Sequence, residues 1–311
     1  MAILVAADFS PAEWEAWWPA LEAALPGEAL VRDRRDAAAD DIKIALVANP
    51  PPGALRDLPQ LRLIQSLWAG VDRLLADASV PAHVPLARMV DPAMNEAMAH
   101  TALWAVLSLQ REFFVYAAQQ RRGAWRRLAW RSAGDLSVAV LGLGQMGRRT
   151  AQLLGAQGYR VIGWSRGTTA IDTVQTFAGA AALPSVLAAA DIVVNLLPLT
   201  SETNGLFNAA TLGALPRGAS LVNLARGAHV VEADLLAALD TGQLAHAVLD
   251  VFDTEPLPPG HAFWSHPAVT VLPHVAAPTD PRSAARVAAA NVQAFRSGRT
   301  LAHGVDRTRG Y

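Results

Sequence analysis

Three residues that could act together on a carbonyl group follow apolar, strand-like segments in the second half of the chain. They are Arg226, Glu255 and His274, and each comes at or shortly after the carboxyl end of its segment. In an open α/β sheet, ligands bind in the crevice beyond those strand ends. A guanidinium, a carboxylate and an imidazole gathered there could polarise a 2-oxo acid and transfer one proton. The three residues therefore indicate an enzyme.

Each of these side chains has a task in the reduction of a carbonyl group. Arg226 could bind the substrate carboxylate and keto oxygen and stabilise the negative charge that develops there. Imidazoles titrate near neutral pH, so His274 could donate the proton, and Glu255 could fix its tautomer. Taken singly, each residue could equally be structural, as an ion pair, a turn cap or a buried histidine. Their joint occurrence on consecutive strands favours catalysis.

A glycine-rich turn typical of dinucleotide sites precedes these segments. It reads G-x-G-x-x-G, directly after an expected strand and before a helix expected over residues 148–154. The glycines would permit a tight turn, approach of the backbone to a pyrophosphate, and close helix packing. Because the motif lies within a strand–turn–helix unit, it predicts a dinucleotide-binding turn. The predicted contacts are Gly142, Leu143, Gly144, Gln145, Met146 and Gly147.

The following strand ends at Ser165 and Arg166, where an NAD-binding site usually carries an acid for the ribose hydroxyls. The next acid, Asp172, lies six residues beyond Arg166. A hydroxyl beside a guanidinium suits a 2′-phosphate, so we predict that NADP(H) is preferred and that NAD(H) is accepted less well. Alternatively, Arg166 is an ordinary exposed turn residue. Further predicted cofactor-binding residues are Leu197, Pro198, Thr203, Leu224, Ala225, Asp250 and Ala276.

The composition excludes several classes of protein. The 311 residues suffice for two domains, 52% are hydrophobic, and the net charge is −1, which argues against a nucleic-acid or anionic-membrane partner. Without cysteine there are no disulfides or thiolate metal sites. The remaining seven histidines lack metal-ligand spacing, so no metal is predicted. The apolar stretch 180–199 is interrupted by Pro and Asp, so a soluble cytoplasmic protein is expected.

Residues 121–131 contain five arginines interleaved with two tryptophans. We interpret this run as the solvated face and exit of a long helix over residues 93–120, in preference to an anion-binding or nucleic-acid-binding patch. A helix of that length suggests a crossover between domains or a dimerisation arm.

Elsewhere, apolar strand candidates alternate with helical stretches, which is typical of α/β proteins with doubly wound parallel sheets. Helices are expected over 11–25, 232–239 and 282–297. The expected strands are 3–6, 42–47, 61–67, 136–141, 160–164, 191–197, 219–225, 245–251 and 269–272.

Several motifs together resemble those of the D-isomer-specific 2-hydroxyacid dehydrogenase family along essentially the whole chain. The ending 305–311 is similar to that of a subgroup that reduces glyoxylate and hydroxypyruvate. By contrast, Gly167–Thr169 lacks the additional basic residue that this subgroup often carries. The segments that carry the resemblance are 140–144, 195–198, 223–227, 234–240, 249–252, 255–259, 273–277 and 305–311.

The resemblance implies a fold and a further set of contacts. A Rossmann dinucleotide-binding domain, residues 96–277, would be inserted in a flavodoxin-like substrate domain, residues 1–95 and 278–311. The catalytic set would be Arg226, Glu255 and His274, and the long helical arm would form a homodimer. Backbone amides of the loop after residue 67 would bind the substrate carboxylate, which implies contacts from Trp68, Ala69, Gly70 and Val71.

The sequence therefore predicts an NADPH-preferring enzyme that reduces small 2-oxo acids, such as glyoxylate and hydroxypyruvate, to 2-hydroxy acids by hydride transfer. The product would have the D configuration where it is chiral. The alternative is a non-enzymatic, dinucleotide-sensing interaction protein of the same fold.

Overall fold

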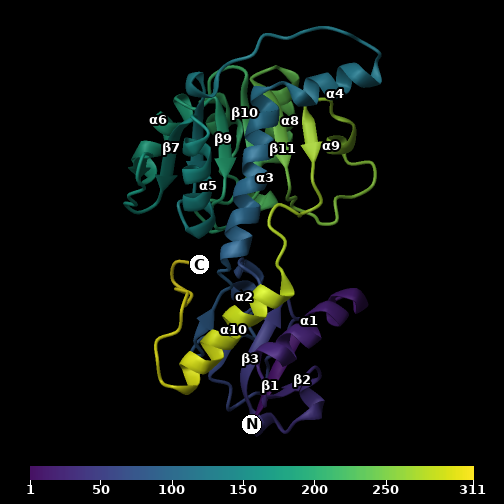
Figure 1. Ribbon diagram of the computed structural model, residues 1–311, viewed down its shortest axis with the longest axis vertical. Helices are drawn as coiled ribbons and strands as arrows, with labels where there is room; N and C mark the ends of the chain where they lie inside the picture. Colours follow the sequence, from purple (N-terminus) through teal and green to yellow (C-terminus); the bar gives the residue numbers. More distant parts are fainter. The chain divides into compact units, whose positions relative to one another are not determined.

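The computed structural model describes residues 1–311, which divide into two compact units (Figure 1). One unit comprises residues 1–94 and 279–311, and the other comprises residues 95–278. None of the helices combines the length and apolar character needed to cross a membrane.

The unit of residues 1–94 and 279–311 is built on a parallel sheet in the order β2-β1-β3-β4-β5. This is the strand order of flavodoxin-like folds. The central strands are almost wholly apolar and buried, because helices cover both faces of such a sheet. The strands are β1 (Ala2–Ala7), β2 (Ala29–Val31), β3 (Ile42–Ala48), β4 (Leu63–Ser66) and β5 (Leu86–Ala87).

The two longest helices of this unit begin at well-formed caps. Ser10 and Glu13 form a capping box at the start of α1, and the Asp280 carboxylate accepts bonds from two amides at the start of α10. The helical segments are α1 (Pro11–Ala24), η1 (Arg34–Asp36), η2 (Ala39–Asp41), α2 (Asp72–Ala76) and α10 (Pro281–Arg296).

The unit of residues 95–278 contains a seven-stranded parallel sheet in the order β12-β11-β10-β9-β6-β7-β8. This is the Rossmann order with one strand added. The order in which successive strands are added to the sheet reverses between β6 and β9, although all strands are parallel. The prediction of two doubly wound parallel sheets is confirmed. The strands are β6 (Ser137–Leu141), β7 (Arg160–Ser165), β8 (Gln175–Ala178), β9 (Ile192–Asn195), β10 (Ala219–Asn223), β11 (Leu244–Leu249) and β12 (Val269–Val271).

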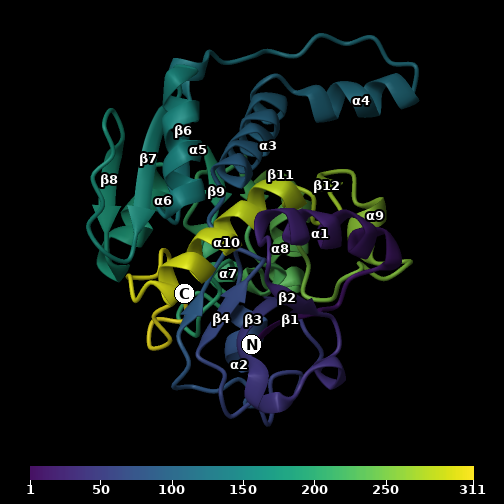
Figure 2. The same cartoon turned by 60° about the horizontal axis from the view of Figure 1, so that its bottom comes forward.

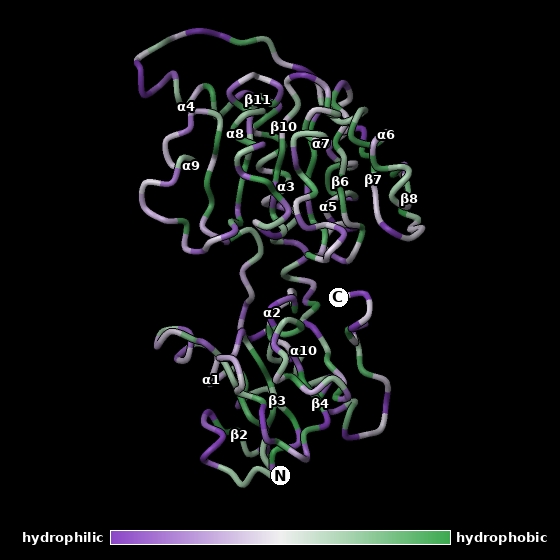
Figure 3. Tube along the Cα trace, turned by 180° about the vertical axis from the view of Figure 1, so that it is seen from behind, coloured by the Kyte–Doolittle hydropathy of each residue, from purple (hydrophilic) through white to green (hydrophobic).

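Two apolar cores lie on opposite faces of this sheet, since alternate residues of β6 contribute to different clusters. Helices α3 and α5 pack on one face, as Figure 1 shows, and α6 to α9 pack on the other. Figure 3 shows the strands as predominantly hydrophobic segments. The helical segments are α3 (Pro92–Gln110), which begins just before the unit boundary, α4 (Phe113–Arg121), η3 (Ala133–Asp135), α5 (Gln145–Ala156), η4 (Ala180–Ala182), α6 (Leu183–Ala188), α7 (Ala209–Gly213), η5 (Gly227–His229), α8 (Glu232–Asp240) and α9 (Ala262–Ser265).

The prediction of a single long helix over residues 93–120 is wrong. The helix is interrupted between α3 and α4, where Glu112 adopts a left-handed conformation with φ of 56°. No glycine or proline marks the break in the sequence. Instead, Phe114 of α4 stacks on the buried His246 of β11, with ring centroids 4.6 Å apart, so tertiary packing redirects the helix.

The arginine run is exposed at the exit of a helix, as predicted, although that helix is α4 and not one long helix. Only Arg121 lies in α4, and the chain then continues without regular structure to Ser132. Figure 2 shows α4 and this segment running along the outside of the unit. Arg131 forms an ion pair with Asp191, with 2.6 Å between Nη1 and Oδ1, while Trp125 is 93% exposed.

Three glycines allow turns to approach one another at the carboxyl edge of the large sheet. A Cβ on Gly142 would lie 2.6 Å from the Leu196 carbonyl oxygen, and one on Gly147 would lie 1.7 Å from that of Gly142. A Cβ on Gly227 would lie 1.8 Å from the carbonyl carbon of Phe252. No side chain fits at such distances. Gly142 and Gly227 therefore let turns after neighbouring strands approach each other, and Gly147 lets α5 pack on its own turn.

We predict that Gly227→Ala destabilises the protein by about 3 kcal/mol, because a backbone must move to admit the methyl group. Urea unfolding followed by circular dichroism measures this. Gly213→Ala is the matched control, since a Cβ at the end of α7 meets nothing within 4 Å, and its effect should stay within about 1 kcal/mol. Equal unfolding midpoints for the two variants would contradict the steric account.

Candidate active site

The turn that carries His274 is held by a buried carboxylate at the end of β11. The Asp250 side chain is 1% exposed and accepts hydrogen bonds from the amides of Val275 and Ala276, at 2.7 and 3.0 Å. The His274 amide donates to the Asp250 carbonyl oxygen at 2.8 Å. These bonds hold His274 in a left-handed conformation, with φ of 54°, which costs energy for a residue with a side chain. Burial raises the pKa of Asp250, and the two amides oppose that rise.

His274 and Glu255 form a hydrogen-bonded pair, with 2.8 Å between Nδ1 and Oε2. The other carboxylate oxygen of Glu255 accepts from the Phe252 amide at 3.0 Å, so the acid is anchored to its own turn. Burial alone would raise the pKa of Glu255. The hydrogen bonds from His274 and Phe252 and the charges of His274 and Arg226 outweigh burial and hold this pKa below its ordinary value.

The ionised carboxylate can only accept hydrogen bonds, and this fixes the tautomer of His274. Nδ1 must carry a hydrogen, so Nε2 is the ring atom left to exchange a proton with a ligand. The imidazole is about half exposed, so that exchange is sterically open.

Arg226 lies three residues beyond the end of β10, at the N-cap of the short helix η5 (Gly227–His229). Its Nη1 donates to the Ala225 carbonyl oxygen at 2.7 Å, and its charge acts on Glu255. Residues from the turns after β10, β11 and β12 are thus brought together at one edge of the sheet. Sequence reasoning expected this meeting of strand ends.

The glycine-rich turn lies between β6 and α5, with Gly144 as the N-cap of the helix. A Cβ on Gly144 would meet nothing within 4 Å, in contrast to its crowded neighbours Gly142 and Gly147. The first amides of a helix have no acceptor within it and favour an anion. Open space beside these amides, at the reversal of strand order, fits a dinucleotide pyrophosphate.

Ser165 and Arg166 lie at the end of β7, which pairs with β6 on the side opposite β9. The Ser165 hydroxyl donates to the Gly167 carbonyl oxygen at 2.7 Å, and Arg166 lies 4.0 Å from a Glu202 carboxylate oxygen. From α5, Arg148 donates through Nη1 to the Ala170 carbonyl oxygen at 2.9 Å. One guanidinium group therefore lies within residues 165–170 and a second contacts that stretch from α5, and no Asp or Glu lies within it in sequence.

The remaining predicted cofactor residues also lie at strand ends of this unit. Pro198 is fixed through its carbonyl oxygen by the Thr203 hydroxyl at 2.8 Å, and the Leu224 amide donates to the Asn195 carbonyl oxygen at 3.2 Å. The others are Leu197, Ala225, Asp250 and Ala276, which all lie in the turns after β9, β10, β11 and β12.

The loop of residues 68–71 lies in the other unit, between β4 and α2. Ser66 Oγ donates to the Trp68 carbonyl oxygen and accepts from its amide, at 2.9 and 3.1 Å. The Trp68 ring packs edge-on against Trp17 and Phe9. The amides of Ala69, Gly70 and Val71 donate no hydrogen bond within their unit.

Sequence reasoning missed three residues at this edge of the sheet. Asn195 and Asn223, the last residues of β9 and β10, and His229 of η5 are fully buried and hydrogen-bonded to one another. A polar residue closing an apolar run was the available signal for the two asparagines. No such signal marked His229, because its neighbours in sequence do not indicate that it is buried. No group of three or more His, Asp or Glu side chains is arranged to hold a metal ion.

Comparison with known proteins assigns the chain to a family. Residues 103–276 match the family model described as D-isomer specific 2-hydroxyacid dehydrogenase, NAD binding domain. A glyoxylate/hydroxypyruvate reductase A of Serratia proteamaculans is 43% identical over 302 residues, 96% of each protein.

Solved structures agree in sequence and in fold. A D-isomer specific 2-hydroxyacid dehydrogenase from Xanthobacter autotrophicus, in complex with NADPH and MES, superposes with a TM-score of 0.94 at 40% identity, covering 100% of this chain and 99% of that one. An NADPH-dependent glyoxylate/hydroxypyruvate reductase from Sinorhizobium meliloti, in complex with NADP and sulfate, gives 0.93 at 37% identity with the same coverage. The chain belongs to the D-isomer specific 2-hydroxyacid dehydrogenase family.

Proposed function

We propose that this protein reduces small 2-oxo acids, such as glyoxylate and hydroxypyruvate, to 2-hydroxy acids with NADPH as the preferred reductant. The observation that carries the proposal is the His274–Glu255 pair, joined at 2.8 Å beside Arg226 and in the same unit as the glycine-rich turn. The reductases of Serratia proteamaculans and Sinorhizobium meliloti support this choice of substrate.

The unit of residues 95–278 is the proposed dinucleotide-binding domain, and residues 1–94 with 279–311 form the proposed substrate domain. The turn of residues 142–147 would hold the pyrophosphate, and the turns after β9, β10 and β12 would line the nicotinamide side. When bound, the reduced nicotinamide supplies the hydride that the keto carbon accepts.

Arg226 binds and orients the substrate in this proposal. Its planar guanidinium can donate to the carboxylate and to the keto oxygen in a fork, which fixes the angle of approach to the keto carbon. As that oxygen gains negative charge, the same donors bind it more strongly, so the interaction favours the transition state over the ground state.

His274 donates the proton from Nε2 to the developing alkoxide, which gives the hydroxyl group of the product. The ring then becomes neutral and keeps its hydrogen on Nδ1, facing the Glu255 carboxylate. Glu255 stabilises the protonated ring before the transfer and holds its orientation throughout. Solvent returns the proton, because the imidazole is about half exposed.

The backbone amides of Ala69, Gly70 and Val71 are proposed to bind the substrate carboxylate. Support comes from their lack of acceptors within their own unit, since amides that converge in a turn favour anions. The ring of Trp68 would line the same loop. Its contacts with Phe9 and Trp17 restrict its movement.

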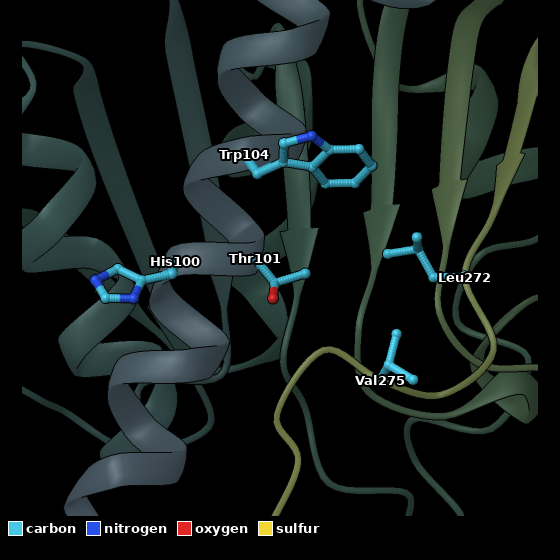
Figure 4. A pocket seen from close by; sticks show the side chains of 5 residues that line it. All are labelled: His100, Thr101, Trp104, Leu272 and Val275. Atoms are coloured by element: carbon cyan, nitrogen blue, oxygen red, sulfur yellow. The ribbon is translucent and has the colours of Figure 1, made fainter.

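A second copy of the chain is proposed to cover the apolar side chains of α3, α4 and the segment after α4. Large exposed apolar patches mark interaction surfaces. A pocket of about 340 Å³ beside α3 extends the patch, with Thr101 and Trp104 pointing toward Leu272 and Val275 (Figure 4). The exposed apolar residues are Trp104, Leu107, Phe113, Val115, Trp125 and Trp130.

We predict that Arg226→Ala lowers kcat/KM for glyoxylate by at least about a hundredfold, because two charge-assisted hydrogen bonds are lost. Loss of NADPH absorbance measures the rate. Arg217→Ala is the control, since Arg217 is exposed and bonds only the Thr241 carbonyl oxygen in the same unit. Wild-type protein that oxidises NADPH with no member of a 2-oxo acid panel would overturn the proposed function and favour the dinucleotide-sensing alternative.

Arg166→Asp should lower the ratio of kcat/KM for NADPH to kcat/KM for NADH by about tenfold to a hundredfold. A carboxylate at this position repels the 2′-phosphate and accepts hydrogen bonds from the ribose hydroxyls. Arg217→Asp, with the same charge change elsewhere, should leave the ratio unchanged. If wild type, Arg166→Asp and Arg217→Asp all give the same NADPH-to-NADH ratio, Arg166 is an ordinary turn residue.

The double variant Phe113→Ser/Trp125→Ser should raise the dissociation constant of the dimer by at least about tenfold, because aromatic anchors dominate such interfaces. Light scattering across a dilution series measures it. Trp264→Ser is the control, since Trp264 is an exposed tryptophan on α9, outside the patch. A monomeric wild-type protein, or an equally stable dimer in the double variant, would refute the proposed interface.

A further inference from the structure

Beneath Arg226, three fully buried polar side chains form a continuous hydrogen-bonded network. Asn195 Nδ2 donates to Asn223 Oδ1 at 3.0 Å and contacts His229 Nδ1 at 2.9 Å. His229 Nε2 lies 3.3 Å from the Pro198 carbonyl oxygen. The residues come from the ends of β9 and β10 and from η5, so the network joins the three segments that surround Arg226.

The orientation of every group in the network is determined by its partners. The Leu197 amide donates to Asn195 Oδ1, which leaves Asn195 Nδ2 facing the other two residues. An amide nitrogen only donates, so His229 Nδ1 must accept and Nε2 must carry the hydrogen given to Pro198. His229 is therefore held neutral, in one tautomer. Replacing its ring removes both an acceptor and a donor from a buried site.

The network ends on the backbone of Arg226. Asn223 Oδ1 also accepts from the Ala225 amide at 3.3 Å, and Asn223 Nδ2 donates to the Arg226 carbonyl oxygen at 2.9 Å. The His229 amide donates to the same carbonyl oxygen at 3.3 Å. The Asn223 side chain and the His229 backbone amide thus both fix the Arg226 peptide, and the Arg226 side chain is itself partly buried.

We propose that Asn195, Asn223 and His229 are positioning residues for Arg226, with His229 completing the network. This rests on the proposed function, in which Arg226 binds the 2-oxo acid. The guanidinium lies at the end of a long side chain with four rotatable bonds. A small rotation of the Arg226 peptide therefore moves it farther than a hydrogen bond to the substrate can stretch. A displacement of such a group by about 1 Å lowers the reaction rate roughly a hundredfold.

A second buried histidine in the same unit provides a matched control. His246, at the amino half of β11, is 8% exposed, and its Nε2 lies 2.9 Å from the Thr270 hydroxyl. His246→Leu and His229→Leu each remove a buried imidazole from the same unit, but only His229 connects to Arg226. His229→Gln retains an acceptor and a donor and serves as the conservative variant.

Steady-state kinetics with glyoxylate and NADPH should show that His229→Leu lowers kcat/KM by about tenfold to a hundredfold, with His229→Gln within about threefold of wild type and His246→Leu within about twofold. In an Arg226→Ala background, His229→Leu should change kcat/KM by less than about twofold, because it acts through the missing guanidinium. The proposal would be overturned if the separate losses of kcat/KM from Arg226→Ala and His229→Leu multiplied in the double variant. Unchanged kinetics in His229→Leu would also overturn it.

Amide hydrogen exchange gives a readout that does not depend on the reaction. Exchange of residues 224–230 should become at least about tenfold faster in His229→Leu and stay unchanged in His246→Leu, at matched global stability. If wild-type protein reduces no 2-oxo acid, the proposed function fails while exchange still decides whether the network fixes the turn. Unchanged exchange in His229→Leu, or an equal rise in both leucine variants, would refute the positioning role.

Discussion

Buried polar side chains at the ends of neighbouring strands determine where the reactive groups lie. Asn195 closes β9, Asn223 closes β10 and Asp250 follows β11, and all three are almost inaccessible to solvent. A buried polar group that finds no partner costs about 1–3 kcal/mol. At the end of a parallel strand the nearest partners are the amides and carbonyls of the turns, so satisfying these groups also fixes the turns.

The same constraint explains why the fold tolerates unfavourable backbone at His274. Its left-handed conformation is compensated by bonds to Asp250 on both sides of the turn, and the imidazole is thereby aimed at Glu255. In the turn after β10, Gly227 lets the backbone next to Arg226 approach Phe252 more closely than any side chain would allow. A strained residue and a close approach of two backbones are thus both found where the reactive groups converge.

Much of this arrangement could be predicted from sequence. Apolar runs that end in Arg226, Glu255 or His274 mark strand ends, and the parallel sheet gathers those ends at one edge. The break at Glu112 could not be predicted, because it depends on Phe114 reaching His246, 132 residues away. Similarly, nothing next to His229 in sequence indicates that it is buried against Asn195, since that contact joins η5 to the end of β9.

The central claim is that Glu255 and His274 act as one acid–base unit. The most direct test is kcat/KM for glyoxylate reduction in Glu255→Gln, which keeps an acceptor for Nδ1 but removes the charge, measured with and without His274→Ala. The account predicts that Glu255→Gln costs at least about tenfold alone and less than about twofold when His274 is absent, because Glu255 acts through the imidazole. Losses that multiply in the double variant would contradict it.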